Sequence, residues 1–495
     1  MKKILKIFRK RRILISGCFF YAIIMLLSIS AFTGKSVNKN NTSTSRPNVL
    51  VIMADQWRAF AFGHRGNQDI RTPNIDKLAK EGAEFVNAVS EMPVCTPTRA
   101  SIMTGQRPLT NGVFMNDVLL DTNAVTLGKV MSKAGYHTAY IGKWHLNGQY
   151  RSAYIPPGNR RQGFQYWKVL ECTHNYNHSI YYADTPDTLL WKGYDAIAQA
   201  KDACNYIKDH ANDKQPFFLF LSWGPPHNPY HTAPQKYKDL YVPEKIHLRP
   251  NVPKEMAKKV QFDLSGYYAH CTALDDMVGL LRNTLKKTGI EKKTIVIFIS
   301  DHGDLLGSHG HYHKQQPYDE SIRVPMIFYV PKALGGASRR LDAMINFVDF
   351  MPTLLGLTSV EIPDCVEGID YSKYIKGGKN PGDTVTLISC VQPFGEWNRK
   401  RGGREYRGLR SLRYTYVKDL NGPWLFFDNK KDPYQMDNLI GNKEYQNLVK
   451  RFDILLTKKL NENGDHFLPG IEYVKKWKYP PLDKNGTVPY YVGSY

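Results

Sequence analysis

The chain has 495 residues, which is too long for one minimal domain and suits a large unit with a smaller second one. Apolar residues make up 42% and aromatic residues 12% of it, so the chain can bury a large core and is not an intrinsically disordered protein. Its formal net charge of +22 favours an anionic partner: nucleic acid, an anionic membrane or an anionic substrate.

Residues 1–30 predict an export signal, which would make this a periplasmic or secreted protein. Seven Lys or Arg residues and no acid precede an apolar run, and the run ends in small residues before Ala31, as a cleaved signal does. Without this segment the charge falls from +22 by seven, to about +15, so the exported chain stays basic. The alternatives are a retained membrane anchor, a lipoprotein anchored at Cys18 and a twin-arginine signal at Arg11 and Arg12. Once the signal is removed, no stable membrane span is expected.

Residues 31–46 are expected to be a polar linker, and from 47 to 385 strand and helix patterns alternate. Apolar, β-rich runs predict strands at 48–56, 137–144, 216–223 and 293–304. Amphipathic runs predict helices at 72–82, 124–134, 194–210, 265–287 and 347–356. The alternation predicts an α/β domain with a mostly parallel sheet flanked by helices.

After residue 385 the pattern changes to that of a smaller α+β unit. Side chains alternate through 405–439, with Asn-Gly and Asp-Pro turns that are typical of an antiparallel meander. A final helix is expected near 443–462. Residues 386–495 are therefore predicted to form a C-terminal subdomain with an antiparallel sheet.

Polar residues follow the predicted strands at the point where each strand ends. In a parallel sheet these carboxyl ends lie at one edge, where ligands bind. The residues are Asp55, Gln56, Lys143, His145, His227, Asp301 and His302, with Lys314 in the segment after the last strand. One such residue is usually a cap or turn residue, but repeated signals at one edge predict a shared site.

The acidic and amide members of this set predict a divalent-cation site. Asp55, Gln56 and Asp301 offer hard oxygen ligands, which favour Ca²⁺ or Mg²⁺. His302 is unusual for Ca²⁺ and leaves Mn²⁺ or Zn²⁺ open. Cationic side chains predict in addition an anionic group held between metal and protein. They are Lys143, Lys314 and Arg99.

Cys95 lies in the segment PVCTPTRASIMTGQRP, residues 93–108, and from its residues three interpretations are open. It is a packed core cysteine, a thiolate nucleophile, or a cysteine that is converted into another group. Pro97 suits the first turn of a helix, which puts Cys95 at the helix N-terminus, where free N–H groups favour negative charge. Calcium prefers oxygen, so a metal-lined pocket suits an unmodified thiol poorly.

The segment CTPTRASIMTG resembles the C-x-P-x-R signature of the sulfatase family. The resemblance continues, in order, through RPNVLVIMADQWR, TPNIDKLAKEGAEFVNAVS, GYHTAYIGKWHLNG, YYAHCTALDDMVGLL, IVIFISDHGDLLGSHG, VDFMPTLLGL and LFFDNKKDPYQMDNL, and covers residues 46 to 445. It implies a sulfuric ester hydrolase with an alkaline-phosphatase-like α/β fold. Residues 47–385 would then be the catalytic domain, and a small C-terminal sheet domain would follow.

The resemblance also implies a nucleophile and its metal. Cys95 would be oxidised to formylglycine by a formylglycine-generating maturation enzyme, and the hydrated aldehyde would be an oxygen nucleophile that also contacts the metal. Asp55, Gln56, Asp301 and His302 would hold one cation per chain, most often Ca²⁺ in this family. The cation would lower the pKa of the attacking hydroxyl.

Five further residues receive roles from the same resemblance. Arg99, Lys143 and Lys314 would bind and polarise the sulfate. His227 would protonate the leaving alcohol. His145 would help the sulfated hemiacetal to collapse, which regenerates the aldehyde and releases sulfate.

A sulfated carbohydrate, either a glycan or a glycosaminoglycan fragment, is the predicted substrate. Gln56 and His302 depart from the Asp–Asp and Asp–Asn pairs of many arylsulfatases, and Asp–Gln and Asp–His pairs are common among carbohydrate sulfatases. The alternatives are a phosphonate or phosphodiester hydrolase of the same superfamily and a catalytically inactive glycan-binding homologue. Nucleic acid is not an expected partner, because the sequence has no aromatic–basic module.

Two polar segments stay outside these assignments. Three histidines alternate within 309–313, which indicates either a second metal site or a solvated, substrate-lining loop. The basic run 399–413 is either a polyanion-binding surface, with Arg404 and Arg407 as candidates for substrate contact, or a solvated edge.

Overall fold

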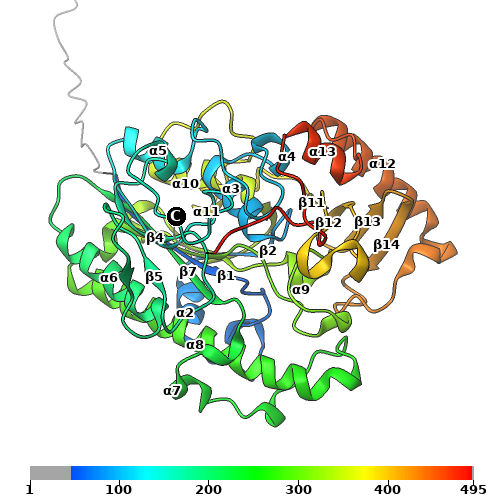
Figure 1. Cartoon of the computed structure of the whole chain (residues 1–495), viewed down its shortest axis with the longest axis horizontal. Coiled ribbons are helices and arrows are strands. Elements are labelled where there is room, and N and C mark those ends of the chain that lie inside the picture. Colours follow the sequence, from blue (N-terminus) through cyan, green and yellow to red (C-terminus); the bar gives the residue numbers. More distant parts are fainter. Residues whose placement is uncertain (1–45, 493–495) are drawn as a thin grey trace, which may run out of the picture. The chain divides into compact units, whose positions relative to one another are not determined.

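An eight-stranded sheet runs through the computed structural model, which describes residues 46–492 (Figure 1). The predicted signal at 1–30, Cys18 and all but the last residue of the predicted linker lie outside the described residues. The strand order is β10-β2-β9-β8-β1-β7-β3-β4. The strands are β1 (Asn48–Asp55), β2 (Ala83–Val89), β3 (His137–Lys143), β4 (Tyr166–Leu170), β7 (Phe217–Pro226), β8 (Thr294–Ser300), β9 (Met326–Tyr329) and β10 (Arg339–Asn346).

The predicted mostly parallel sheet is confirmed. β1 lies between β7 and β8 and runs parallel to both, with Val49 opposite Phe218 on one side and Ile295 on the other. In this sheet β9 runs antiparallel to both of its neighbours, β2 and β8. The central strands are buried along almost their whole length, which explains why their sequences are continuous apolar runs.

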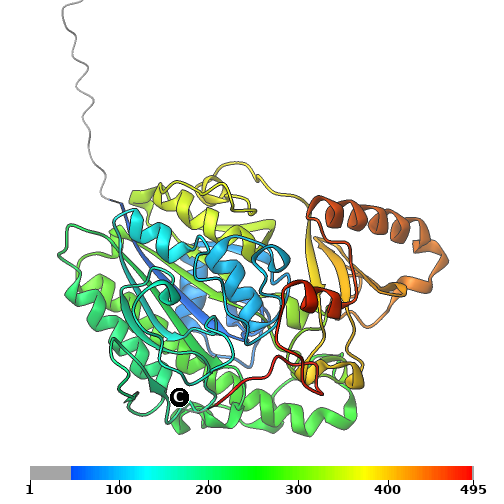
Figure 2. The ribbon, with the colours of Figure 1, turned by 45° about the horizontal axis from the view of Figure 1, so that its top comes forward.

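Helices cover both faces of this sheet (Figures 1 and 2). Leu50 and Ile52 of β1 pack in one apolar cluster with α2, α6 and α8. Val49 and Val51, which point the other way, pack in a second cluster with α3, α5 and α10. The helices are α2 (Pro73–Glu81), α3 (Cys95–Thr104), α5 (Leu127–Lys133), α6 (Asp195–Asp209), α8 (Ala257–Lys287) and α10 (Phe350–Thr358).

The predicted strands and helices of this domain are all present, with ends that differ by a few residues. The helix predicted at 265–287 begins earlier, at Ala257, because Val260 and Leu264 extend its buried side by two turns. The sequence did not predict β2, β4, β9 or β10. Their apolar runs are short or are interrupted by charged residues. These segments are strands because they pair with neighbouring strands, and their own sequences favour the strand only weakly.

The C-terminal sheet has four antiparallel strands, as the turn pattern predicts. They are β11 (Val385–Cys390), β12 (Tyr406–Ser411), β13 (Tyr414–Asp419) and β14 (Gly422–Asp428). α12 (Gln446–Glu462) packs on this sheet through Leu456 and Leu460, and α13 (Gly470–Lys476) follows it. Residues 46–492 form one compact unit and are not divided at residue 385. The domain boundary at 385 stays a prediction.

Among the helices within residues 46–492, none combines the length and apolarity needed to cross a bilayer. The six cysteines of this part of the chain carry no disulfide.

A buried ion pair connects the C-terminal sheet to α9 (Asp319–Ile322). Arg410 of β12 donates from Nε and Nη2 to the two carboxylate oxygens of Asp319, at 2.8 and 2.9 Å, at the start of α9. Burial alone would raise the pKa of Asp319, but Arg410 and then Arg323 lower it to about 2. Each partner is buried, so neither charge is solvated if the other is lost.

Replacing Arg410 by Leu should lower the free energy of unfolding by about 3 kcal/mol, because Asp319 stays buried without its main partner. Urea denaturation measures the loss. Lys458→Ala removes an exposed helical ion pair with Glu462 and should leave the urea midpoint unchanged. Since the pKa of Asp319 is below its unfolded value of about 3.9, the pair contributes above pH 4 and its contribution is lost as the pH falls towards 2. Equal urea midpoints for Arg410→Leu and the wild type would contradict this.

Candidate active site

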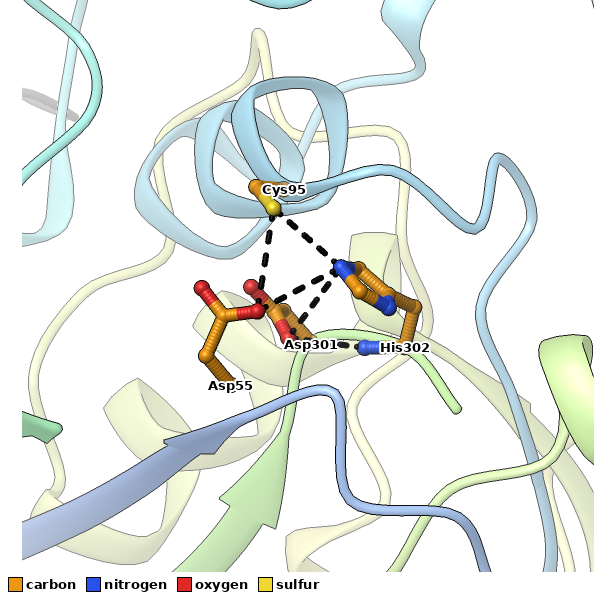
Figure 3. Close-up of side chains that lie close together, drawn as sticks. All are labelled: Asp55, Cys95, Asp301 and His302. Atoms are coloured by element: carbon orange, nitrogen blue, oxygen red, sulfur yellow. Dashed lines mark hydrogen bonds and ion pairs between the residues drawn. The ribbon is translucent and has the colours of Figure 1, made fainter. Parts of the chain in front are cut away.

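The residues predicted from strand ends meet at the carboxyl edge of the sheet. Asp55 ends β1, Lys143 ends β3, His227 follows β7, and Asp301 and His302 follow β8. Cys95 is the first residue of α3, which lies over this edge. Figure 3 shows its side chain directed at Asp55, Asp301 and His302. These side chains are all buried.

The start of α3 is built to hold Cys95 in place. Val94 is extended and Cys95 begins the helix, and the free N–H of Thr96 donates to the side chain of Asn116 at 3.1 Å. Every residue of α3 is buried, so the helix does not shift without disturbing the core. The predicted helix and the position of Cys95 at its N-terminus are confirmed.

Asp55, Cys95, Asp301 and His302 bring four ligand atoms to one point. The Cys95 Sγ lies 3.2 Å from His302 Nε2 and 3.7 Å from Asp55 Oδ1. His302 Nε2 lies 3.5 Å from Asp55 Oδ1 and 3.7 Å from Asp301 Oδ1. Ligands at right angles around Ca²⁺, each 2.3–2.6 Å from it, are about 3.3–3.7 Å apart, so the spacing fits a divalent cation.

Hydrogen bonds from neighbouring groups orient these side chains so that their free ligand atoms face one point. His302 Nδ1 donates to the carbonyl of Gly303 at 2.9 Å, which leaves the Nε2 lone pair directed into the site. Asp301 Oδ1 accepts the backbone N–H of Gln56 at 3.1 Å. The Gln56 side chain donates from Nε2 to Asp304 at 2.6 Å, so its carbonyl oxygen faces the site and lies 3.3 Å from Lys314 Nζ. Asp304 is not among the predicted site residues, although it lies in the same SDHGD segment.

Cations surround the two carboxylates. Arg99 Nη2 lies 3.0 Å from Asp55 and 3.1 Å from Asp301, and Nε donates to Asp301 at 3.2 Å. Its Nη1 donates to Ser222 and to the backbone carbonyl of Lys143. Lys143 Nζ lies 2.5 Å from Asp55. Arg99 therefore holds the carboxylates in place, and its predicted contact with sulfate stays a prediction.

The charges of these groups shift one another's pKa values. Burial opposes ionisation of Asp55, but Lys143, His227 and Arg99 hold its pKa well below the usual value. Burial and the charge of Asp55 raise the pKa of Asp301. Burial and Asp55 would also raise the pKa of the Cys95 thiol, yet Lys143, Lys314 and His302 hold it low. The position of Cys95 is thus electrostatically suited to an anion.

Lys314 and His227 lie on the other side of Cys95. Lys314 Nζ is 3.2 Å from Cys95 Sγ and 2.9 Å from His227 Nε2. His227 Nδ1 donates to the carbonyl of Asn228, and the ring stacks on His174 with 4.7 Å between centroids. Burial and then Lys314 hold the pKa of His227 well below its usual value. His174 lies in a loop and carried no sequence signal.

His145 is the last of the predicted residues at this edge, and it is buried. Its Nε2 lies 3.3 Å from Asp117 Oδ1, and Asp117 is held by two hydrogen bonds of 2.7 Å from Arg151. Burial would lower the pKa of His145, but Cys172, Asp117 and Cys95 raise it to about 9. Asp117 and Arg151 lie in loops without periodicity, so the sequence did not reveal them.

A cavity of about 490 Å³ is lined by His313 and Asn228, the chain neighbours of Lys314 and His227. Trp397, His311 and Arg401 line it as well. It combines aromatic rings with polar and charged groups. A larger cavity of about 1500 Å³ lies between α2 and α8, but none of the predicted site residues line it.

Two interpretations of the remaining polar segments are corrected. Arg407 does not face a ligand: its side chain is 1% exposed and pairs with Asp465. The histidines within 309–313 do not alternate along an extended strand, because His309 has a left-handed φ of 57° and stacks on Tyr318. The metal-ligand groups found among residues 46–492 do not include them.

The sequence matches a family model described as Sulfatase over residues 47–360, and one described as N-sulphoglucosamine sulphohydrolase, C-terminal, over 307–463. It is 42% identical over 463 residues to the ulvan-active sulfatase of Formosa agariphila, covering 92% of this chain and 89% of that protein.

Solved structures show the same similarity. The putative sulfatase yidJ of Bacteroides fragilis has a TM-score of 0.78 and 32% identity, covering 87% of this chain and 98% of that one. The protein BT4656, solved in complex with its substrate D-glucosamine-2-N,6-O-disulfate, has a TM-score of 0.73 and 25% identity, covering 86% and 99%. The predicted alkaline-phosphatase-like fold is confirmed.

Chelation of divalent cations should lower the Tm of the protein, because Asp55 and Asp301 then repel each other without a bound cation. Free Ca²⁺ at 100 times its Kd should restore about 2.7 kcal/mol of stability. Asp301→Asn should weaken this Ca²⁺-dependent rise at least tenfold in Ca²⁺ concentration, whereas Asp342→Asn, at an exposed position, should keep it. Differential scanning fluorimetry and elemental analysis measure the effect. A Tm that responds to none of Ca²⁺, Mg²⁺, Mn²⁺ and Zn²⁺ would show that the site holds no cation.

Proposed function

Because this chain belongs to the sulfatase family, we propose that it removes sulfate from a sulfated carbohydrate through a formylglycine derived from Cys95 and a bound Ca²⁺. One observation carries the proposal. Cys95 stands between a carboxylate–imidazole group that fits a cation and two lysines, Lys143 and Lys314, that suit an anion. A nucleophile in that position reaches a sulfate group whose charge the surrounding residues compensate.

The modification of Cys95 supports this chemistry better than the thiol does. The hydrated aldehyde supplies one hydroxyl that attacks sulfur and a second whose deprotonation expels sulfate, and a cysteine or serine lacks this second hydroxyl. Since Cys95 is 2% exposed, we infer that the maturation enzyme oxidises it before the chain has folded around it.

The protein's own residues would bind the substrate and move protons. Lys143 and Lys314 would hold the sulfate oxygens, and Arg99 would keep Asp55 and Asp301 in place. His227 would give a proton to the leaving oxygen. An anionic ester beside His227 and Lys314 would raise the low pKa of His227, because the ester's charge offsets that of the lysine. Substrate binding would therefore favour protonation of His227, which could then act as the acid.

We propose Ca²⁺ as the cation. The oxygens of Asp55, Asp301 and Gln56 are hard ligands, and the ligand spacing of 3.5–3.7 Å is wider than the about 2.9 Å expected around the smaller Mg²⁺. Asp55, Gln56, Asp301, His302 and residue 95 would hold it. When bound, the cation would lower the pKa of the attacking hydroxyl.

The 490 Å³ cavity lined by His313 and Asn228 supports a carbohydrate as substrate. A sugar stacks on aromatic side chains and hydrogen-bonds to polar ones, and Trp397, His311 and Arg401 supply both kinds of contact. The names of two similar proteins mention a saccharide: one is an ulvan-active sulfatase, and the other was solved with a glucosamine disulfate as its substrate. Export, predicted from residues 1–30, would bring the enzyme to such polysaccharides.

The wild type should release sulfate from members of a panel of sulfated mono- and disaccharides and should turn over a phosphodiester more slowly. Cys95→Ser should reduce sulfate release by at least about a thousandfold in a host that matures cysteine only, because the aldehyde is then absent. Ion chromatography measures the sulfate, and mass spectrometry of the peptide with residue 95 measures the modification. Cys204→Ser, at a buried cysteine of α6, is the matched control and should leave the modification of residue 95 unchanged.

Fully active enzyme with an unmodified thiol at position 95 would refute the formylglycine proposal. Faster turnover of the phosphodiester than of every sulfate ester would favour the phosphonate or phosphodiester hydrolase. Glycan binding without any hydrolysis would favour the inactive homologue.

Arg401→Ala should raise KM for a sulfated disaccharide about fivefold and leave kcat/KM for nitrophenyl sulfate unchanged, because Arg401 is exposed in the cavity and lies outside the sulfate site. The matched control Arg413→Ala, on the C-terminal sheet, should change neither value. Steady-state kinetics with both substrates test this. An equal loss on both substrates would show that the cavity does not bind the sugar.

A further inference from the structure

The C-terminal tail runs beside the loop that follows His145. The backbone N–H of Tyr491 donates to the carbonyl of Gln149 at 2.8 Å, and that of Arg151 donates to the carbonyl of Tyr491 at 3.0 Å. The Gln149 side chain donates to the carbonyl of Pro489 at 2.6 Å. Figures 1 and 2 show this red segment crossing from the C-terminal sheet to the larger domain. It lies beyond residue 463, where the second family model ends.

The tail contacts the arginine that holds Asp117. The Arg151 guanidinium lies over the ring of Tyr490, 3.5 Å from its centroid. On its other side it donates from Nε and Nη2 to the two carboxylate oxygens of Asp117, both at 2.7 Å. The ring shields the guanidinium from water and restricts the rotamers of Arg151. The ring therefore helps to keep the two donating nitrogens, Nε and Nη2, directed at Asp117.

Asp117 in turn determines how His145 points. Its Oδ1 accepts from Nε2 of His145 at 3.3 Å, so the Nδ1 atom of His145 is directed away from Asp117. That Nδ1 is buried and has no hydrogen-bond partner among the described residues. Asp117 and His145 have left-handed φ angles of 64° and 58°, a strained backbone that the surrounding contacts must maintain. Asn116, next to Asp117, binds the start of α3 beside Cys95.

We propose that Asp117, Arg151 and Tyr490 are positioning residues for His145, and that the tail at 489–491 is a strap that keeps the His145 ring in this orientation, with Nδ1 directed away from Asp117. The inference rests on the proposed role of His145 in sulfate-ester hydrolysis. The strap connects the C-terminal end of the chain to one proton-transfer group of the site. Residues 489–491 are not among the residues proposed to hold the sulfate or the cation.

Removing the strap should slow turnover without weakening substrate binding. We expect Tyr490→Ala to lower kcat about fivefold and Asp117→Asn to lower it about tenfold to a hundredfold, each with KM unchanged. Tyr490→Phe keeps the ring and should behave as the wild type. Tyr434→Ala removes a similar ring, which lies 4.8 Å from Arg249, and should not change kcat.

A double-mutant cycle separates positioning from a general structural effect. In a His145→Ala background Tyr490→Ala should have no further effect on kcat, because the residue it positions is gone. The same fivefold loss in both backgrounds would overturn the proposal, as would wild-type kcat in Tyr490→Ala and Asp117→Asn.

A second measurement does not depend on the activity. Diethyl pyrocarbonate should modify His145, followed in its tryptic peptide, several times faster in Tyr490→Ala than in the wild type or in Tyr490→Phe. Equal rates would overturn the strap. A wild type that hydrolyses no sulfate ester would refute the proposed function instead, and the modification rates would still decide whether the tail positions His145.

Discussion

Two buried carboxylates at the ends of neighbouring strands are the constraint on which the site depends. Asp55 and Asp301 share one Arg99 nitrogen, at 3.0 and 3.1 Å, in a place without solvent. Two like charges about 4 Å apart repel by about 4 kcal/mol at an effective dielectric constant of 20, so such a pair persists only among cations. Arg99 and Lys143 supply part of that charge, and the remaining ligand atoms suit a metal.

The fold makes this concentration of charge possible. Parallel strands bring their carboxyl ends to one edge, and the helices on both faces supply the apolar packing that offsets the cost of burying the polar edge. α3 contributes Cys95 with its N-terminal N–H groups on the same edge, and Arg99 follows one turn later on the same helix. One helix therefore carries both Cys95, the proposed nucleophile, and the Arg99 guanidinium, which holds two of the proposed metal ligands.

The C-terminal part of the chain participates in this arrangement at two places. Arg410 on β12 pairs with buried Asp319, shortly after Lys314 in the chain, and the tail reaches Arg151 behind His145. The segment between β11 and β12 also supplies Trp397 and Arg401 to the cavity that His313 lines. Residues on both sides of position 385 thus line the cavity proposed to bind the sugar.

The sequence by itself determined the α/β class, the antiparallel C-terminal meander and the polar strand-end residues that meet at one edge of the sheet. Those inferences rest on local rules: a buried strand needs an apolar run, a turn needs Asn-Gly or Asp-Pro, and a polar residue directly after such a strand lies at the ligand edge. The tertiary structure alone decided that Arg407 is a core ion-pair residue, that β9 is antiparallel, and that Asp117, Arg151 and Tyr490 lie behind His145. These depend on contacts between segments far apart in the chain, up to 340 residues for Gln149 and Pro489, which no local pattern records.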